Sequence, residues 1–85
     1  MNTATAQIET EIQVSAHILS TTINTLHDVM DVSEILDDHE AILRWSIDLH
    51  DWEKVLKVVS TDDLTLSDVR RLVNMKGFEA KELNH

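Results

Sequence analysis

The stretch IQVSAHILSTTINTLHDVM, residues 12–30, decides the fold class that we expect for this chain of 85 residues. Its apolar residues recur at intervals of three and four, the spacing of one face of an α-helix. The residues on this face are Ile12, Ala16, Leu19, Ile23, Leu26 and Met30. We therefore predict a long amphipathic helix over about residues 4–30. Its weak point is Ser20–Thr25, whose β-branched and capping-type residues lower helix propensity.

The apolar face of this predicted helix also has the heptad form of a coiled-coil seam. Two interpretations follow: the face packs against other helices of a bundle, or it pairs with a second copy of the chain. The oligomer seam would then be formed by Ile12, Leu19, Ile23 and Leu26. A homodimer therefore stays open beside a monomer.

A second helix is predicted to begin after Asp31, with Asp31 as N-cap and Glu34 as its capping-box partner. The apolar residues from Ile35 to Val59 are spread too broadly for one stripe, so this segment is expected to be central. We predict helices over about residues 32–48 and 51–60, with one long helix as the alternative.

A last helix is predicted over about residues 66–76. Thr65 is its N-cap, Asp68 the capping-box partner, and Gly77, the only glycine, the left-handed residue after its end. Residues 79–85 form a tail. The sequence thus predicts an all-α fold: one domain over residues 1–85, built as a bundle of three to four helices.

The charge of the chain is −9 and is concentrated in its first half. Residues 1–43 contain eight acids and no Lys or Arg, which argues against nucleic acid as a partner and favours a basic one. Five acids lie close together without a cation nearby: Asp31, Glu34, Asp37, Asp38 and Glu40. They form either a partner-binding face for a basic or amphipathic segment of another protein, or a solvated face.

Motifs for catalysis or for a resident metal or cofactor are absent from the sequence. There is no Cys, no Gly-rich phosphate loop and no Gly-x-Ser-x-Gly turn, so we expect no enzyme and no cofactor. His27 and Asp31 lie one turn apart, but two ligands make only a weak site, so we predict no metal site. Trp45 and Trp52 share a helix face as core or as an interface anchor, of which we favour the core.

No apolar run reaches the roughly 20 residues that span a bilayer, and the first residues lack the pattern of a signal peptide. We therefore expect a protein that does not span a membrane and resides in the cytoplasm.

Three stretches resemble the small r-locus lysis-inhibition accessory proteins of T-even-type bacteriophages. They are QIETEI (residues 7–12), INTLH (23–27) and DDHEAILRWSID (37–48). The resemblance implies a small cytoplasmic antiholin, a non-catalytic regulator that binds the cytosolic part of a holin and delays host lysis. Two alternatives remain: a DNA-mimic inhibitor of a nucleic-acid-binding protein, and a helix-turn-helix-like regulator that uses Arg70 and Arg71.

Overall fold

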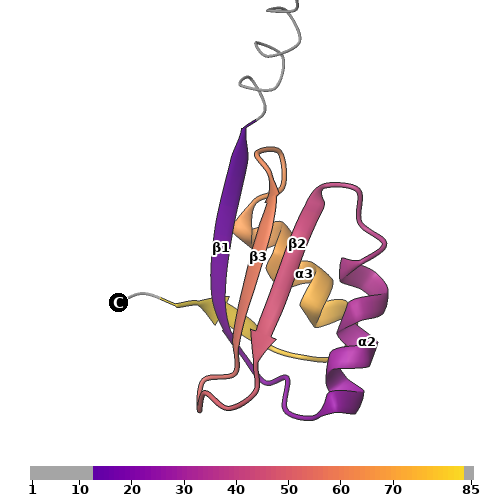
Figure 1. Cartoon of the computed structure of the whole chain (residues 1–85), viewed down its shortest axis with the longest axis vertical. Helices are drawn as coiled ribbons and strands as arrows, with labels where there is room; N and C mark the ends of the chain where they lie inside the picture. Colours follow the sequence, from indigo (N-terminus) through magenta and orange to yellow (C-terminus); the bar gives the residue numbers. More distant parts are fainter. Residues whose placement is uncertain (1–12, 84–85) are drawn as a thin grey trace, which may run out of the picture.

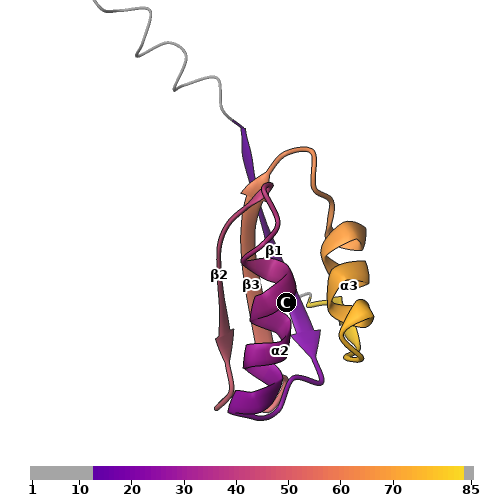
Figure 2. The same cartoon turned by 90° about the vertical axis from the view of Figure 1, so that its right-hand side faces the viewer.

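The structure, a computed structural model, describes residues 13–83. Its elements are β1 (Val14–Thr21), α2 (Leu26–Leu36), β2 (Ile42–Asp48), β3 (Val55–Thr61), α3 (Leu66–Met75) and β4 (Ala80–Glu82) (Figure 1). The strands form one antiparallel sheet in the order β2-β3-β1-β4. Both helices lie on the same side of this sheet (Figure 2). The βαββαβ order with this arrangement is the ferredoxin-like fold.

The prediction of an all-α bundle is wrong. β1 occupies Val14–Thr21, inside the predicted first helix, and its predicted residues 4–12 lie outside the described residues. β2 and β3 replace most of the helices predicted over 32–48 and 51–60, and the alternative of one long helix fails with them. The physical reason is tertiary pairing: segments rich in the β-branched residues Val, Ile and Thr fit a pleated sheet better than a helix, where the χ1 freedom of these side chains is restricted.

The two central strands, β1 and β3, are buried with a period of two. His17, Leu19 and Thr21 of β1 point toward the helices, and so do Leu56 and Val58 of β3. Alternate side chains of a strand point to opposite faces of a sheet. The register pairs His17 with Val58 and Leu19 with Leu56, so these buried side chains form one continuous apolar face under the helices.

The core lies between that face of the sheet and the two helices. Val32 and Leu36 of α2 and Val69 and Val73 of α3 are completely buried. Ile35, Trp45, Ile47 and Phe78 are among the partly buried residues packed around this centre. The core buried by residues 13–83 consists of Leu19, Ile23, Val32, Leu36, Leu56, Val58, Leu64, Val69, Val73 and Ala80.

The predicted last helix is confirmed as α3. Thr65 is its N-cap and Asp68 completes the capping box. Gly77 follows the helix with φ of 92°, its amide donates to the Asn74 carbonyl, and the Phe78 amide donates to the Val73 carbonyl. This pair of hydrogen bonds is a Schellman motif, which needs the left-handed residue that glycine supplies without strain. Helix signals were therefore reliable where a capping box and a glycine bracketed the helix.

Within residues 13–83, neither helix has the length and apolar character needed to cross a bilayer. A single domain over residues 1–85 stays a prediction, since residues 1–12 and 84–85 lie outside the part of the chain that the structure describes.

Candidate metal site

The turn between β1 and α2 is fixed at both ends. Ile23 is buried in the core, and its amide donates to the Thr21 hydroxyl at 3.2 Å. The Thr22 amide donates to the Glu79 carbonyl just before β4, at 3.1 Å. Because these contacts hold the turn against the sheet, the first residues of α2 have a defined position at one end of the molecule (Figure 1).

The helix itself starts at a capping box that differs from the predicted one. Thr25 is the N-cap: its hydroxyl accepts from the Asp28 amide at 3.1 Å, and the Asp28 Oδ2 accepts from the Thr25 amide at 3.1 Å. The prediction that Asp31 caps a helix with Glu34 as box partner is wrong, since both residues lie inside α2. The sequence contains both patterns. The earlier start is favoured by the hydrogen bonds from the Asn24 and Thr25 amides to Asp28 and by Val29, which packs against the core from the first turns of α2.

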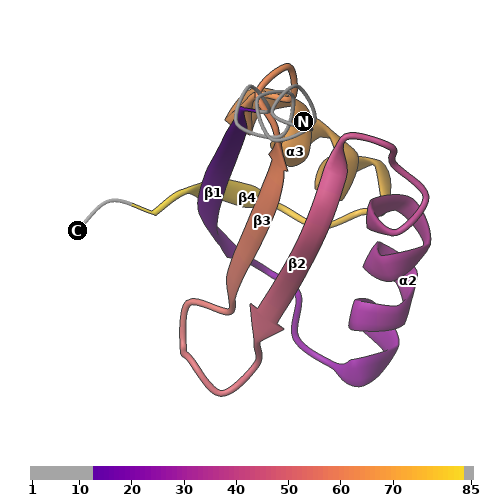
Figure 3. The same cartoon turned by 45° about the horizontal axis from the view of Figure 1, so that its top comes forward.

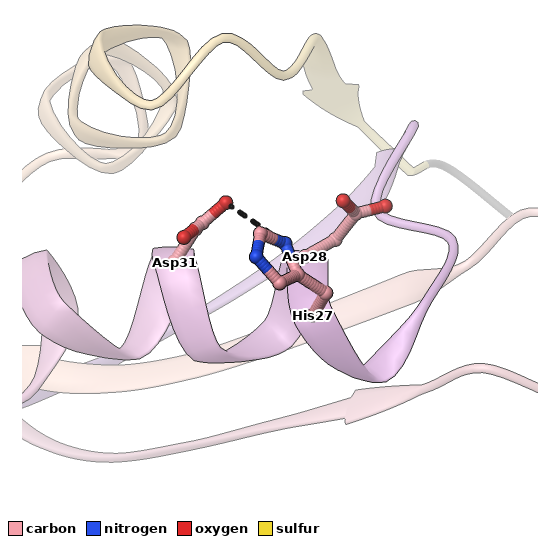
Figure 4. Close-up of side chains that lie close together, drawn as sticks. All are labelled: His27, Asp28 and Asp31. Carbon is pink, nitrogen blue, oxygen red and sulfur yellow. Dashed lines mark ion pairs between the residues drawn. The ribbon is translucent and has the colours of Figure 1, made fainter.

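Three potential metal ligands gather at this end of α2. The His27 Nδ1 lies 3.5 Å from the Asp31 Oδ2, and one ligand atom of Asp28 lies within 4.8 Å of both (Figure 4). His27 is exposed, whereas Asp28 and Asp31 are partly buried. Two atoms bound to one tetrahedral ion at about 2.0–2.1 Å are roughly 3.3 Å apart. The spacing of His27 and Asp31 therefore suits a shared ion, and Asp28 lies beside them as a third candidate ligand.

The Asp28 carboxylate is held in its charged form by the turn that precedes it. Hydrogen bonds from the backbone amide of Asn24, and then from the amide and hydroxyl of Thr25, lower the pKa of Asp28 below its usual 3.8. The nearby His27 lowers it further. The amide and hydroxyl of Thr65 lower the pKa of Asp68 in the same way at the start of α3. Both capping carboxylates are thus ionised at neutral pH.

These two carboxylates give a prediction for acid stability. A pKa that is lower in the folded state stabilises the fold above the usual value of 3.8. That contribution is lost as the pH falls through the folded pKa. We compare the free energy of unfolding at about pH 5 and pH 3. We expect it to fall less over this range in Asp28→Ala and in Asp68→Ala than in the parent protein, because each variant lacks one carboxylate that acid protonates. Urea unfolding at the two pH values measures this. Asp38→Ala is the control, since the Asp38 carboxylate accepts no hydrogen bond within residues 13–83; an equal change in Asp38→Ala would contradict the assignment.

The five acids of the predicted partner-binding face lie on and just after α2. Glu34 forms an ion pair with Lys76, whose Nζ lies 2.8 Å from the Glu34 Oε1 and lowers the pKa of Glu34. The Asp37 Oδ1 accepts from the Trp45 indole at 2.7 Å. The expectation that this cluster lacks a neighbouring cation is therefore wrong at Glu34. The whole set is Asp31, Glu34, Asp37, Asp38 and Glu40, and its role in partner binding stays a prediction.

The residues of the predicted oligomer seam do not share a helix face. Leu19 lies on β1 and Ile23 in the following turn, and both are buried in the core of this single chain. Leu26 is 74% exposed on α2, and Ile12 lies outside the described residues. A seam that needs all four on one helix is wrong because the first helix is replaced by a strand.

The two tryptophans have different environments. Trp45 packs against the core from β2, as favoured by the sequence, whereas Trp52 is 85% exposed in the turn between β2 and β3. The two residues do not share a helix face, so the spacing of seven carried no structural information. Sequence reasoning also missed His17, the first of three alternate buried residues of β1, followed by Leu19 and Thr21.

Comparisons with known proteins identify the fold. No family model matches the sequence, and no curated protein matches it. The structure is similar to the CsoZ metallochaperone, with 14% identity and a TM-score of 0.70 over 81% of this chain and 99% of that chain. It is also similar to oxidized MerP from Ralstonia metallidurans CH34, with 10% identity and a TM-score of 0.72 over 84% of this chain and 99% of that chain. A copper binding domain from HMA7, a P-type ATPase, gives 20% identity and a TM-score of 0.70 over 81% and 93% of the two chains.

These likenesses overturn the function predicted from the sequence. The resemblance to lysis-inhibition proteins is wrong, and so is the antiholin function that it implied, because the similar structures are metallochaperones and metal-binding domains. The helix-turn-helix alternative falls with the all-α fold, since α3 follows the strand β3 and not a helix. The DNA-mimic alternative is overturned with the rest of the predicted function by the similarity to metal-handling structures. At identities of 10–20%, these comparisons show a fold that this chain shares with metallochaperones and metal-binding domains, and no more than the fold.

Proposed function

We propose that this chain is a non-catalytic metal-binding protein that holds a divalent transition-metal ion at the start of α2. The observation that carries the proposal is the 3.5 Å separation of the His27 Nδ1 and the Asp31 Oδ2, with Asp28 beside them. The fold shared with metallochaperones supports the same class of function. His27 and Asp31 would supply the first two ligands, and Asp28 or water a third.

The donor atoms decide which metal suits this site. The chain contains no Cys, so thiolate ligands for copper(I) are not available from it. Imidazole nitrogen suits zinc(II), copper(II) and nickel(II), and carboxylate oxygen is compatible with all three. We therefore propose a divalent ion of this group as cargo, in place of the soft monovalent ion that thiolates favour.

Two features limit the strength with which the ion is held. The positive end of the α2 dipole opposes a cation at this position, although the charges of Asp28 and Asp31 offset it. In addition, the Asp28 Oδ2 already accepts two backbone hydrogen bonds, so a large movement of this side chain toward the ion would cost the N-cap. Only two ligands are well placed at the start, and water would fill the open positions. The site thus suits transient binding of an ion better than permanent structural binding.

Exposed carboxylates beyond the other end of α2 add negative charge to the helical layer of the molecule. Asp38 and Glu40 are exposed and pair with no Lys or Arg within residues 13–83. A cluster of unpaired carboxylates raises the local concentration of cations. We propose that the same carboxylates attract a basic segment of a partner protein with which the ion is exchanged.

Metal titration of the full chain tests the proposal. We expect zinc(II) or copper(II), added at neutral pH, to bind one equivalent by calorimetry. Zinc(II) should shift the NMR signals of residues 25–31, and paramagnetic copper(II) should broaden the same signals. His27→Ala and Asp31→Asn should each weaken binding by at least about tenfold, because each removes one of the two well-placed ligands. Binding should also weaken at acidic pH, where protons compete for the ligands. Calcium(II) and magnesium(II) should bind less tightly than zinc(II), since they prefer oxygen ligands alone.

His50→Ala is the matched control. His50 is also exposed, and its amide donates to the carboxylate of Asp48, two residues earlier. It lies outside α2, in the turn between β2 and β3. An equal loss of affinity in His50→Ala and His27→Ala would indicate non-specific binding to surface histidines. That result, or the absence of binding to the parent protein, would overturn the proposal.

A further inference from the structure

The face of the sheet that points away from the helices has no covering element within residues 13–83 (Figure 2). The side chains on this face alternate along each strand with those in the core. They are apolar on β1, apolar apart from Lys57 in the middle of β3, and polar or charged on β2. They include Val14, Ala16 and Ile18 of β1, Val55, Lys57 and Val59 of β3, and Arg44, Ser46 and Asp48 of β2. We call this set the open face.

The register arranges the open face in rows across the strands. Ser46, Lys57 and Ile18 form one row, and Asp48 and Val55 belong to the next. A third row contains Arg44, Val59 and Ala16. A hollow of about 600 Å³ spans the first two rows. It is lined by Ile18, Ser46, Ile47, Asp48, Asp51, Val55, Lys57 and Leu83.

Charges of both signs lie on or beside the open face without forming ion pairs, and Lys57, Asp48 and Asp51 among them line the hollow. Lys57 and Arg44 form no ion pair within residues 13–83, and neither do Asp48 and Asp51. Since successive rows on one face of a strand are roughly 7 Å apart, Lys57 and Asp48 are neighbours rather than direct partners. The open face therefore has an unpaired cation in one row and an unpaired anion in the next.

An ordered turn extends this face at the end where β2 joins β3 (Figure 3). The Asp48 Oδ1 accepts from the amides of His50 and Asp51, and the Lys54 Nζ donates to the Leu49 carbonyl at 2.8 Å. The Thr21 hydroxyl donates to the Lys54 carbonyl at 2.6 Å, which ties the turn to the end of β1. Trp52 is 85% exposed on this turn. A large aromatic side chain on an ordered backbone is typical of an interface anchor.

We propose that the open face binds a second copy of this chain in a two-fold symmetric dimer. A two-fold axis that crosses the strands between the Lys57 row and the Asp48 row places each Lys57 over the partner's Val55 and beside the partner's Asp48. The same rotation brings the Trp52 turn over the partner's Val59, Ala16 and Arg44. Each contact then occurs twice, as a two-fold interface requires. Lys57 pairs with a carboxylate, and Trp52 covers aliphatic side chains next to a guanidinium group.

The size of the open face sets the expected strength. The three strands of the open face, about 4.8 Å apart and about five residues long, present a surface of roughly 14 by 17 Å. Two such surfaces with the Trp52 turns stay below the roughly 1,200 Å² of a standard specific interface, in the range of weak and transient contacts. We therefore expect a reversible dimer with a dissociation constant in the micromolar range. This dimer does not depend on the proposed metal site, which lies on a helix of the opposite layer.

Sedimentation equilibrium of the full chain, in the presence of EDTA, tests the dimer. Over protein concentrations from about 5 to 500 μM, the mass should rise from 9.7 kDa toward twice that value. Trp52→Ala and Lys57→Glu should each weaken association by at least about tenfold. NMR signals that move on dilution should belong to β1, β3 and the 48–54 turn.

Arg70→Glu is the matched control for Lys57→Glu, because it makes the same change of charge at an exposed position of α3. A dimer that Arg70→Glu weakens as much as Lys57→Glu would not use the open face. A mass of 9.7 kDa at every concentration, or association only after metal is added, would likewise overturn the proposal. Circular dichroism of Trp52→Ala should match the parent, since the removed side chain is exposed.

Discussion

Leu36→Ala is expected to lower the free energy of unfolding by about 2–5 kcal/mol. Leu36 is completely buried at the end of α2, in the core between the helices and the sheet. Truncation removes apolar area and leaves a cavity that the surrounding side chains fill only in part. A chain of this length has about 4–13 kcal/mol of stability in total, so the loss is a large fraction. Urea unfolding followed by circular dichroism measures it.

Leu26→Ala is the control, because it removes the same atoms from the first residue of the same helix. Leu26 is 74% exposed, so we expect a change within about 0.5 kcal/mol. If Leu26 lay in the apolar seam of a long first helix, Leu26→Ala would instead lower the free energy of unfolding strongly. Equal losses in the two variants would therefore contradict the orientation of α2.

His17→Ala is expected to cost about 2–5 kcal/mol. His17 is 8% exposed on β1, and its Nε2 lies 3.0 Å from the Leu64 carbonyl and 3.1 Å from the Ser60 hydroxyl. Because a carbonyl only accepts, the Nε2 carries the proton and donates to Leu64. The bond fixes the segment after β3 against β1. Thermal and urea unfolding of the variant measure the loss of both the ring and its hydrogen bond.

His17→Phe separates these two contributions. It retains an aromatic ring of similar shape and removes the N–H donor, so the Leu64 carbonyl loses its best partner. We expect a smaller loss of about 1–3 kcal/mol, the cost of a buried polar group left without a hydrogen bond. His50→Ala, at an exposed position, should change stability by less than about 0.5 kcal/mol. If His17→Phe were as stable as the parent, the hydrogen bond would contribute nothing.

Local helix signals in this sequence were informative at one of two capping boxes. At α3, Thr65, Asp68 and Gly77 were identified from the sequence and are confirmed. At α2 the pattern Thr25-x-x-Asp28 was overlooked, because the apolar spacing of residues 12–30 placed it in the middle of a longer helix. In the structure, Ala16 and Leu19 of that spacing point to opposite faces of β1. The intervals of three and four between apolar residues are therefore a coincidence, since β1 in this segment alternates between buried and exposed side chains.

The hairpin between β2 and β3 could not be identified because its usual signals are missing. Hairpin turns are commonly marked by Asn-Gly or Asp-Gly, whose residues adopt positive φ easily. Here the turn contains neither Gly nor Pro, and Lys54 adopts a φ of 49°. β3 added a second difficulty: its sequence VLKVVST is apolar on both faces, so its alternation is hidden. Its four β-branched residues in seven were the remaining signal for a strand.

The candidate metal site was only partly visible in the sequence. The one-turn spacing of His27 and Asp31 is visible in the sequence, but two ligands alone make a weak metal site, so the sequence predicts none. Asp28 joins them only because the helix begins at Thr25, and this start was not predicted. The open face could not be predicted at all, since an all-helical interpretation contains no sheet.

The central position of β1 has a consequence for how the chain reaches its native state. β1 pairs with both β3 and β4. The first pairing places Val14 opposite Thr61, and the second places Leu19 opposite Glu82. Contacts between residues so far apart in sequence must close long loops, and such topologies fold more slowly than helical bundles with local contacts. During synthesis β1 is therefore made before β3 and β4, the two strands with which it pairs. The sheet is complete only when the residues around Glu82 have left the ribosome, so the side of β1 that pairs with β4 remains open until synthesis has passed that point, whereas pairing with β3 can begin earlier.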